Sequence, residues 1–359
     1  MRVAVLGVGL IGGSVALAAR QRLSASVTGF DLRPEALRRA LERGALDRAG
    51  GSIAEAVDGA EVVFVAVPVG GLSRLVGEAL RATPPDCVVT DVGSTKRDVV
   101  AAHADPRFVG GHPLAGAENA GVEHARADLF ETATWYLTPT PVTSGVLYER
   151  LHRLLHGLGA RPTAIDAETH DRILAAVSHL PHVLANVLVA QAASTLKDPV
   201  HPPARLPATG PSFRDATRVA GAPSAIWTDI YMSNRDALVA EIDGAVERLR
   251  AARTAIAAAD RDAITAWNEA AAGDRRELLE SQLAGGDLHE LRVSVPNRPG
   301  VVAQIALELG RAGVNITDMA LYPASDMTEG VVALWIAGSD GADRAQALVA
   351  GLGLPVARA

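Results

Sequence analysis

Three glycines near the start of the sequence, Gly7, Gly9 and Gly12, have the G-x-G-x-x-G spacing that lets a peptide backbone approach a phosphate closely. They follow the apolar run Val3–Leu6, which is typical of a buried strand, and they open an Ala-rich helix. The first glycine permits a tight turn, the second makes room for a pyrophosphate, and the third lets helix and strand pack closely. The segment therefore predicts a dinucleotide site in which free N–H groups at the start of the helix bind phosphate.

A carboxylate about 20 residues after the glycine motif indicates which dinucleotide is bound. Asp31 ends a second strand-like run, Ser26–Phe30, where such folds keep an acceptor for the ribose 2′-hydroxyl. Its negative charge would repel a 2′-phosphate, so the sequence predicts NAD. Arg33 lies close enough in sequence to meet such a phosphate, which leaves the choice between NAD and NADP open. The predicted cofactor-binding residues are Gly7, Gly9, Leu10, Ile11, Gly12, Asp31 and Ser94.

Two more polar segments follow predicted strands. Ser94 and Lys96 come after the strand Cys87–Val92, and His112 comes after Phe108–Gly111, between glycines and a proline. Ligands of open α/β sheets bind at the carboxyl ends of the strands, so an imidazole there predicts a general base, with a structural turn histidine as the alternative. Ser94 is alternatively the N-cap of the next helix. Lys96 opposes the dipole of that helix, which predicts a ligand contact or a buried ion pair.

Strands and helices alternate through residues 1–166. The strands are continuous apolar runs, which is typical of a parallel sheet covered by helices on both faces. The sequence therefore predicts an α/β domain of Rossmann type as the NAD-binding domain. The other predicted strands are Val62–Val67, Thr134–Thr138 and Pro162–Ile165, and the predicted helices include Pro34–Gly44, Leu72–Ala82 and Ser144–Leu158.

Residues 167–285 change to helix after helix and predict an all-α domain. Ala167–Thr195 is apolar almost all round, so we expect it to be buried all round, which one domain core rarely permits and a homodimer interface does. Its longest helical apolar run, Val183–Ala193, is too short to cross a bilayer and contains Asn186 and Gln191, so we expect no membrane segment. Pro181 should kink the helix. His179 and His182, one turn apart, predict a substrate pocket, with core histidines or metal ligands as the alternatives.

The rest of the chain divides at turn-rich segments. Residues 197–211 hold five prolines and predict a loop, either a lid or a connector. Asp215 and Arg218 are three residues apart on a helix, so a surface ion pair is the alternative to a functional role for Arg218. Gly285 and Gly286 predict a linker, after which residues 287–359 have the βαββα pattern of a small α+β domain.

The composition, 48% hydrophobic and 21% charged in 359 residues, is that of a soluble globular protein with a large core. A net charge of -7 gives no electrostatic reason to bind nucleic acid or an anionic membrane. The single cysteine, Cys87, permits no internal disulfide, fits a reducing cytoplasm, and lies in an apolar run typical of the core. A signal peptide beginning at Arg2 is disfavoured, because the glycines are phased to a turn and a second strand follows.

The glycine motif is followed in order by DVGSTK (91–96), GGHPLAGAE (110–118), SHLPH (178–182) and FRDATR (213–218). Together these motifs closely resemble the prephenate dehydrogenase family; the first is shared by many enzymes, whereas the later four are specific. The tail, with VPNRPGVVAQIALEL and GVNI, resembles an ACT domain, a small regulatory fold that binds amino acids. The chain departs from the family at Pro211 and Ser212, where a glycine-rich stretch often stands.

The resemblance implies an NAD-dependent oxidative decarboxylation of prephenate to 4-hydroxyphenylpyruvate in tyrosine biosynthesis. It implies that His112 takes or polarises the proton of the substrate 4-hydroxyl, that Ser94 orients His112, and that Arg218 holds the ring carboxylate. The other pocket residues that it implies are His182, His179, Glu118 and Trp227. It also implies feedback inhibition by L-tyrosine, bound between two ACT-like tails near Asn297, Arg298, Gly300, Asn315 and Ile316.

Three alternatives remain at this point. The substrate could be arogenate, whose side chain carries an ammonium group that prephenate lacks. The chain could belong to the β-hydroxyacid or pyrroline-carboxylate reductases, which share a Rossmann domain and a helical domain but do not need Ser94, His112 and Arg218 together. It could finally be a catalytically inactive sensor of amino acids that has kept NAD binding.

Overall fold

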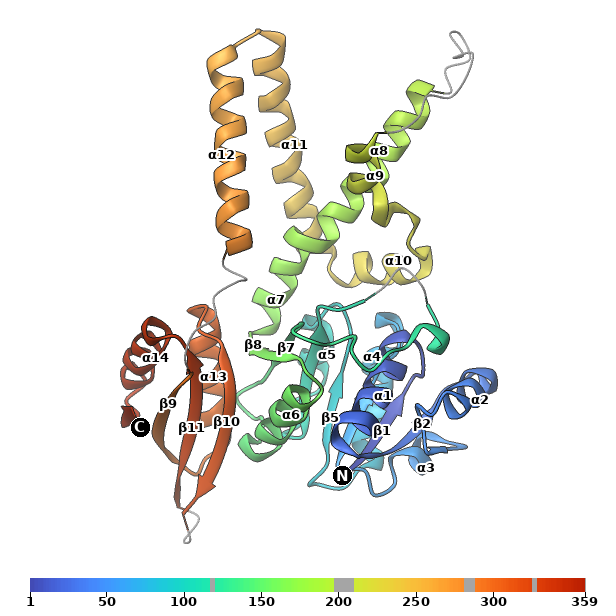
Figure 1. Cartoon of the computed structure of the whole chain (residues 1–359), viewed down its shortest axis with the longest axis vertical. Helices are drawn as coiled ribbons and strands as arrows, with labels where there is room; N and C mark the ends of the chain where they lie inside the picture. The colour runs from blue at the N-terminus through green and yellow to red at the C-terminus, as the bar shows by residue number, and fades with distance from the viewer. Residues whose placement is uncertain (117–119, 197–209, 281–287, 325–327, 359) are drawn as a thin grey trace. The chain divides into compact units, whose positions relative to one another are not determined.

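The computed structural model describes residues 1–116, 120–196, 210–280, 288–324 and 328–358 (Figure 1). The chain divides into two compact units, Met1–His170 with Glu269–Ala359, and Asp171–Asn268. The predicted loop at 197–211 lies almost wholly outside the described residues, as do the predicted linker at Gly285 and Gly286 and the predicted pocket residue Glu118. Each unit is described by itself below.

The first unit is built on an eight-stranded sheet with the strand order β3-β2-β1-β4-β5-β6-β7-β8. The strands are β1 (Arg2–Leu6), β2 (Ser26–Phe30), β3 (Arg48–Ala49), β4 (Val62–Val65), β5 (Val88–Asp91), β6 (Phe108–Pro113), β7 (Thr134–Thr138) and β8 (Arg161–Ala164). Alternate residues of one strand enter different clusters: Val3 and Val5 lie in one core and Ala4 and Leu6 in the other. The sheet is therefore buried on both faces, as the continuous apolar runs predict.

The sheet is largely parallel, and the predicted Rossmann-type fold class is confirmed, but one strand pair differs from the expectation. β7 runs antiparallel to β6, and β8 is parallel to β7. A parallel return needs a crossover, usually an α-helix. The described part of the connection from β6 to β7 contains only the 3₁₀ turn η1 (Val122–His124), so the chain comes back in the opposite direction.

Helices cover the sheet where the sequence predicts them, with two short additions. The helices of this domain are α1 (Leu10–Leu23), α2 (Pro34–Glu42), α3 (Ile53–Val57), α4 (Val69–Ala82), α5 (Arg97–Ala102) and α6 (Gly145–Gly157). α3 and β3 are too short to give a periodic signal in the sequence. α5 begins at Arg97, so Ser94 is not its N-cap.

The C-terminal part of the first unit forms a separate four-stranded antiparallel sheet with the order β10-β11-β9-β12. Its elements are β9 (Leu288–Pro296), α13 (Val301–Arg311), β10 (Ile316–Pro323), β11 (Glu329–Ala337), α14 (Ser339–Gly351) and β12 (Val356–Arg358). This is the predicted βαββα order with the short last strand. Residues of β9, α13 and β11 belong to the same buried cluster as residues of β7 and α6, so the small sheet packs on the large domain.

The small domain packs so closely on the large domain of the first unit that a side chain is excluded at one position. A Cβ at Gly310 of α13 would lie 1.9 Å from the carbonyl oxygen of Ala164 in β8, so only glycine fits there. The Thr163 hydroxyl donates to Asn315 Oδ1 at 3.1 Å. Arg311 and Asp166 form an exposed ion pair at 3.4 Å beside these contacts.

The second unit is helical, as predicted. It contains α8 (Leu180–Leu196), α9 (Pro211–Thr217), the 3₁₀ turn η3 (Arg218–Gly221), α10 (Ser224–Ser233), α11 (Arg235–Ala257) and the start of α12 (Arg261–Glu280). α7 (Ala167–Leu174) leads into it from the first unit.

The predicted kink at Pro181 takes the form of a π-helical turn just before the proline. The turn η2 (Ala175–His179) separates α7 from α8, and the N–H of Leu180 donates to the carbonyl oxygen of Ala175, five residues back. Pro181 has no N–H and its ring crowds the preceding turn, and widening the helix by one residue relieves that crowding.

The expectation that the long apolar helix is buried all round is wrong for the single chain. Val177 is 62% exposed and Val187 is 58% exposed, and Leu184, Leu188 and Val189 are also exposed. By length and composition alone, the helical stretch Ala167–Leu196 is long and apolar enough to cross a membrane, because the helix continues beyond the apolar run that was predicted to be too short. A long apolar helix of a soluble protein passes the same test, so this is weak evidence for a membrane.

One buried histidine lies where the two sheets of the first unit meet. His152 on α6 is 1% exposed, and its ring lies near the backbone of Ile316 at the start of β10. Burial lowers the pKa of His152 to about 4; the carboxylate of Asp318 on β10 acts in the opposite direction, and His156 adds to the lowering. The ring is therefore neutral in the folded protein near neutral pH.

We expect this histidine to make the protein less stable in mild acid. An unfolded histidine binds its proton near pH 6.5, whereas His152 in the folded protein does so only near pH 4. Between these values the unfolded chain holds the extra proton, so the free energy of unfolding should fall by about 1.4 kcal/mol per pH unit as the pH decreases. Urea unfolding from pH 7 to 4.5 measures this slope. His152→Phe should flatten it, and an equal slope in the variant would contradict the assignment.

Candidate active site

The glycine turn between β1 and α1 leaves space at one of its three glycines. Gly7 has a φ of 96°, and a Cβ there would lie 2.3 Å from the carbonyl oxygen of Ala66. A Cβ at Gly12 would lie 2.0 Å from the carbonyl oxygen of Gly7. A Cβ at Gly9, in contrast, would meet nothing within 4 Å. The protein itself requires glycine at positions 7 and 12, whereas the small residue at position 9 keeps clear the space at the start of α1 where a pyrophosphate would bind.

The predicted ribose acceptor is fixed to this turn. Asp31 follows β2, its side chain is 9% exposed, and its Oδ2 accepts a hydrogen bond from the N–H of Val8 at 2.8 Å. Its Oδ1 accepts from the N–H of Arg33 at 2.9 Å, and the exposed Arg33 guanidinium lies 3.3 Å away. The carboxylate is thus held at the carboxyl end of the strand in the position expected for a ribose 2′-hydroxyl acceptor. The residues present fit an NAD cofactor.

A fully buried ion pair joins the ends of β5 and β6. Asp91 accepts from the N–H of Gly93 at 2.8 Å, from the N–H of Gly111 at 3.0 Å, and from the ammonium of Lys96. Both side chains of the pair are 0% exposed. Of the two roles that the sequence left open for Lys96, this is the buried pair. Because Gly111 immediately precedes His112, the carboxylate fixes the backbone that carries the predicted base.

His112 is the penultimate residue of β6, so the strand extends through it rather than ending before it. It is 8% exposed, and its Nδ1 lies 2.9 Å from Nε2 of His170 on α7. His170 is fully buried, and its ring makes an edge contact with Tyr136 of β7 at 5.5 Å between ring centroids. Ser94 is partly buried, and within the described residues its hydroxyl makes no hydrogen bond to His112.

Sequence reasoning missed His170. It lies 58 residues from His112 in sequence and inside a helix whose apolar pattern drew attention to its later half. The only local indication of a functional role for His170 was that an imidazole occurs in the first part of an otherwise apolar helix. A second missed residue, Asn234, lies in the other unit, where its Nδ2 donates to the Asp171 carbonyl at 2.7 Å and to His179 Nδ1 at 3.1 Å.

In the second unit His182 is the centre of an aromatic cluster. Its ring stacks on Trp227 with 3.6 Å between centroids and an interplanar angle of 9°. Nδ1 contacts the hydroxyl of Tyr231 and lies 3.4 Å from the amide Nδ2 of Asn186. An amide nitrogen only donates, so Nδ1 accepts and Nε2 carries the proton. Burial lowers the pKa of His182, and a contact with the backbone of Val219 acts in the opposite direction, so the ring is neutral near neutral pH and presents one N–H donor.

The remaining predicted residues lie as follows. Arg218 begins η3 and is exposed. His179, His182 and Trp227 come together in the second unit, with His179 and Trp227 in edge contact at 6.2 Å. Within the described residues no group of three or more His, Cys, Asp or Glu is placed to hold a metal ion.

Two of the five predicted effector residues, Gly300 and Asn315, contact the large domain of the first unit. The N–H of Gly300 donates to the carbonyl of Thr143 at 3.3 Å, and Asn315 accepts from Thr163 as described above. Ile316 is buried at the start of β10, and Arg298 donates to Gln304 at 3.2 Å. Asn297 donates its N–H to the carbonyl of Thr328 at 2.9 Å.

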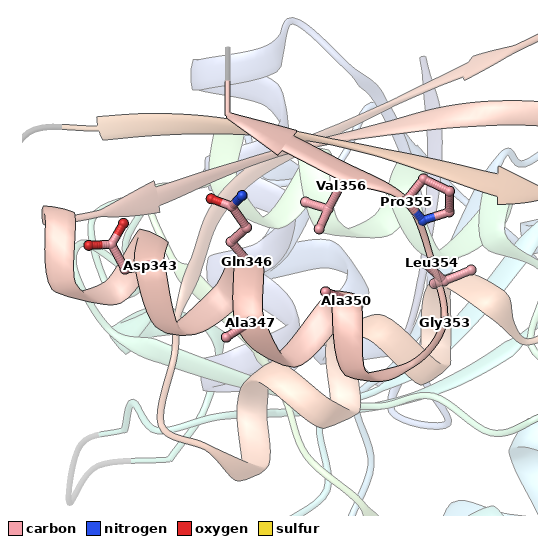
Figure 2. Close-up of a pocket in the computed structure, with 8 residues that line it drawn as sticks. All are labelled: Asp343, Gln346, Ala347, Ala350, Gly353, Leu354, Pro355 and Val356. Carbon is pink, nitrogen blue, oxygen red and sulfur yellow. The ribbon is translucent and has the colours of Figure 1, made fainter.

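An open cavity of about 580 Å³ lies elsewhere on the small domain, between α14 and β12 (Figure 2). Its polar lining is Asp343 and Gln346 of α14, and its apolar floor includes Leu354 and Val356. None of the five predicted effector residues lines it.

Comparison with known proteins accounts for all three parts of the chain. Residues 15–164 match the family model "Prephenate dehydrogenase, nucleotide-binding domain", residues 166–269 match "Prephenate dehydrogenase, dimerization domain", and residues 289–348 match "ACT domain". The chain is 32% identical to the prephenate dehydrogenase of Bacillus subtilis (strain 168) over 95% of this chain and 93% of that protein.

The chain belongs to the prephenate dehydrogenase family. Its members are NAD-dependent oxidoreductases, which confirms the predicted enzyme class and cofactor. The structure of the A. aeolicus prephenate dehydrogenase in complex with hydroxyphenyl propionate and NAD⁺ superposes with a TM-score of 0.71 at 30% identity, covering 77% of this chain and 98% of that one. Synechocystis arogenate dehydrogenase superposes with a TM-score of 0.68 at 27% identity, covering 77% of this chain and all (100%) of that one.

The buried pair below His112 should be costly to break from either side. We expect Asp91→Asn and Lys96→Met each to lower the free energy of unfolding by about 3–5 kcal/mol, because each removes the opposite charge from a group that stays buried. The double variant should cost less than the sum, which a denaturant double-mutant cycle on the full chain measures. Glu78→Gln, which breaks the exposed Arg74–Glu78 pair on α4, is the matched control and should cost less than about 1 kcal/mol. Additive costs for the buried pair would contradict this account.

Proposed function

We propose that this protein oxidises prephenate with NAD⁺ to 4-hydroxyphenylpyruvate and CO₂, a step of tyrosine biosynthesis. The observation that carries the proposal is the buried His112, held at the carboxyl edge of the sheet that also bears the glycine turn. Ligands bind at this edge in open α/β folds. Membership of the prephenate dehydrogenase family supports the choice of substrate.

The chemistry requires a base of near-neutral pKa at the substrate hydroxyl. In the proposed reaction the carbinol proton of prephenate passes to Nε2 of His112 as the C4 hydride leaves, and loss of the ring carboxylate as CO₂ makes the ring aromatic. Neutral imidazole is suited to that proton transfer, and such a base contributes about 10²- to 10⁴-fold. The bound cofactor, held by Gly7–Gly12 and Asp31, supplies the hydride acceptor.

The second unit offers groups that suit a dianionic substrate. Arg218 has a planar guanidinium that can bind the ring carboxylate with two hydrogen bonds. A carboxylate bound too tightly would resist decarboxylation, so we assign Arg218 mainly to orientation. The Nε2–H of His182 suits an oxygen of the pyruvyl side chain, with His179 and Trp227 beside it as pocket wall. Glu118 at the pocket mouth and Ser94 as a partner of His112 or of the cofactor remain predictions.

Arogenate is the second candidate substrate, since the Synechocystis relative is an arogenate dehydrogenase. A relative from Zymomonas mobilis, 35% identical over 72% of this chain and 90% of that protein, is named cyclohexadienyl dehydrogenase. The ratio of kcat/KM for prephenate and arogenate distinguishes the two. Prephenate is our first choice because it is the substrate that the B. subtilis relative is named for.

Two variants test the assignment through NADH absorbance. His112→Asn should lower kcat by about 10²- to 10⁴-fold with NAD binding retained, because the base is lost and the glycine turn is untouched. Arg218→Ala should lower kcat/KM for the substrate, whereas the matched Arg214→Ala, a nearby exposed arginine on α9, should not. Near-normal turnover of His112→Asn would refute the base. Absence of turnover by the wild-type protein with both substrates would favour the inactive sensor.

We also propose that the ACT domain binds L-tyrosine and that two chains associate through the apolar face of the long helix in the second unit. The dimerization-domain match and the exposed Val177, Val187 and Leu184 support that association over a membrane. The biosynthetic substrate and the single buried Cys87 support a soluble cytoplasmic enzyme.

Calorimetry and sedimentation on the intact protein test the effector and the assembly together. Tyrosine should bind with measurable heat, and sedimentation should give the mass of two chains. Asn315→Ala should weaken tyrosine binding, whereas the matched Gln346→Ala, which alters the cavity between α14 and β12, should not. If no heat of binding is measured, tyrosine is not the effector. If Gln346→Ala weakens tyrosine binding and Asn315→Ala does not, the site is the cavity between α14 and β12. A sedimentation mass of one chain would rule out the dimer.

A further inference from the structure

The imidazole proposed as the base is paired with a second buried imidazole that no motif singled out. Nδ1 of His112 and Nε2 of His170 lie 2.9 Å apart, with ring centroids 5.1 Å apart and an angle of 67° between the rings. A nitrogen of a neutral imidazole either donates or accepts, so one of these two must carry the proton of the shared hydrogen bond. The pair therefore links the tautomer of His112 to that of His170.

We infer that His170 is a positioning residue that fixes His112 in the tautomer able to act as a base. If Nδ1 of His112 donates to Nε2 of His170, then Nε2 of His112 keeps its lone pair and can take a proton. In the reverse arrangement His170 donates, Nε2 of His112 already carries its hydrogen, and the ring is no base. This inference rests on the function proposed above, because it assigns His112 the proton of the substrate hydroxyl.

The same hydrogen bond stabilises the charge that forms during the reaction. When Nε2 of His112 takes the hydroxyl proton, the ring becomes an imidazolium whose Nδ1–H still points at the neutral Nε2 of His170. A hydrogen bond from a charged donor is stronger than one between neutral groups, so His170 raises the proton affinity of His112. The positive charge can also pass to His170 by transfer of the Nδ1 proton, with no other reactant needed.

The surroundings in the first unit hold the second ring in place. The backbone N–H of His170 donates to the backbone carbonyl of Asp166 at 2.9 Å and so fixes the start of α7, which carries the ring. Tyr136, the β-sheet partner of His112, places its ring at 90° to that of His170. Among the described residues, Tyr136 contacts the pair, Asp91 with Lys96 holds the backbone next to His112, and Asp166 lies at the start of α7. Burial raises the pKa of Tyr136, and the carboxylates of Asp91 and Asp166 are tied to Lys96 and Arg311.

Two replacements separate the hydrogen bond from simple packing. His170→Phe keeps a ring against Tyr136 and removes the acceptor, whereas His170→Gln places an amide oxygen near the position of Nε2. We expect His170→Phe to lower kcat about tenfold and to move the acid limb of the kcat profile down by about one pH unit, with the KM for NAD⁺ unchanged. His170→Gln should restore most of both. The matched control is His152→Phe, at a buried histidine outside the site, which should leave the acid limb where it is.

An unmoved acid limb in His170→Phe, or a glutamine variant as impaired as the phenylalanine variant, would overturn the inference. A measurement without substrate separates this outcome from failure of the proposed function. Imidazole ¹⁵N NMR of the wild-type protein should report His112 protonated at Nδ1 near neutral pH, and its pKa should fall in His170→Phe. A wild-type His112 protonated at Nε2 would refute the tautomer assignment whether or not the protein oxidises prephenate.

Discussion

The carboxylate of Asp91 is the constraint on which the site in the first unit depends. It is fully buried, and a lone charge there would be prohibitive, so its oxygens must be occupied. They accept from the backbone of Gly93 and Gly111 and from the Lys96 ammonium. Two of these donors lie on the segment after β5 and one on β6, so satisfying a single charge fixes two strand ends against each other.

That constraint reaches the chemistry through one peptide unit. Gly111 has no room for a side chain, because a Cβ would lie 2.6 Å from the carbonyl oxygen of Asp91. His112 is the next residue, and the register of β6 and β7 places it opposite Tyr136. In that position its Nδ1 lies within hydrogen-bond distance of His170 Nε2. The direction of the base is therefore set by the sheet and by buried hydrogen bonds rather than by a mobile loop, which is how a preorganised site avoids reorientation during reaction.

The sequence was informative where function is local and uninformative where it is not. The glycine turn, Asp31 and the strand end bearing His112 were predictable because each depends on a few neighbouring residues with fixed backbone demands. His170, Tyr231 and Asn234 were not, since their partners lie 58, 49 and 55 residues away and no local pattern records such pairs. The antiparallel direction of β7 was not predictable for a related reason. The direction of a strand depends on the connection that precedes it, and an apolar run has the same pattern in either direction.

The position of the ACT domain adds a physical condition to any regulation through it. Two of the effector residues predicted from sequence contact the nucleotide-binding domain of their own chain: Gly300 donates to Thr143, and Asn315 accepts from Thr163 of β8. A ligand that hydrogen-bonds to either residue must replace a hydrogen bond between the two domains, and for Asn315 the bond that is lost is the one to Thr163 of β8. β8 pairs with β7, and β7 pairs with β6 opposite His112. An effector at Asn315 would thus act on the same sheet that carries the base, two strands away, whereas one in the cavity between α14 and β12 would displace none of these contacts.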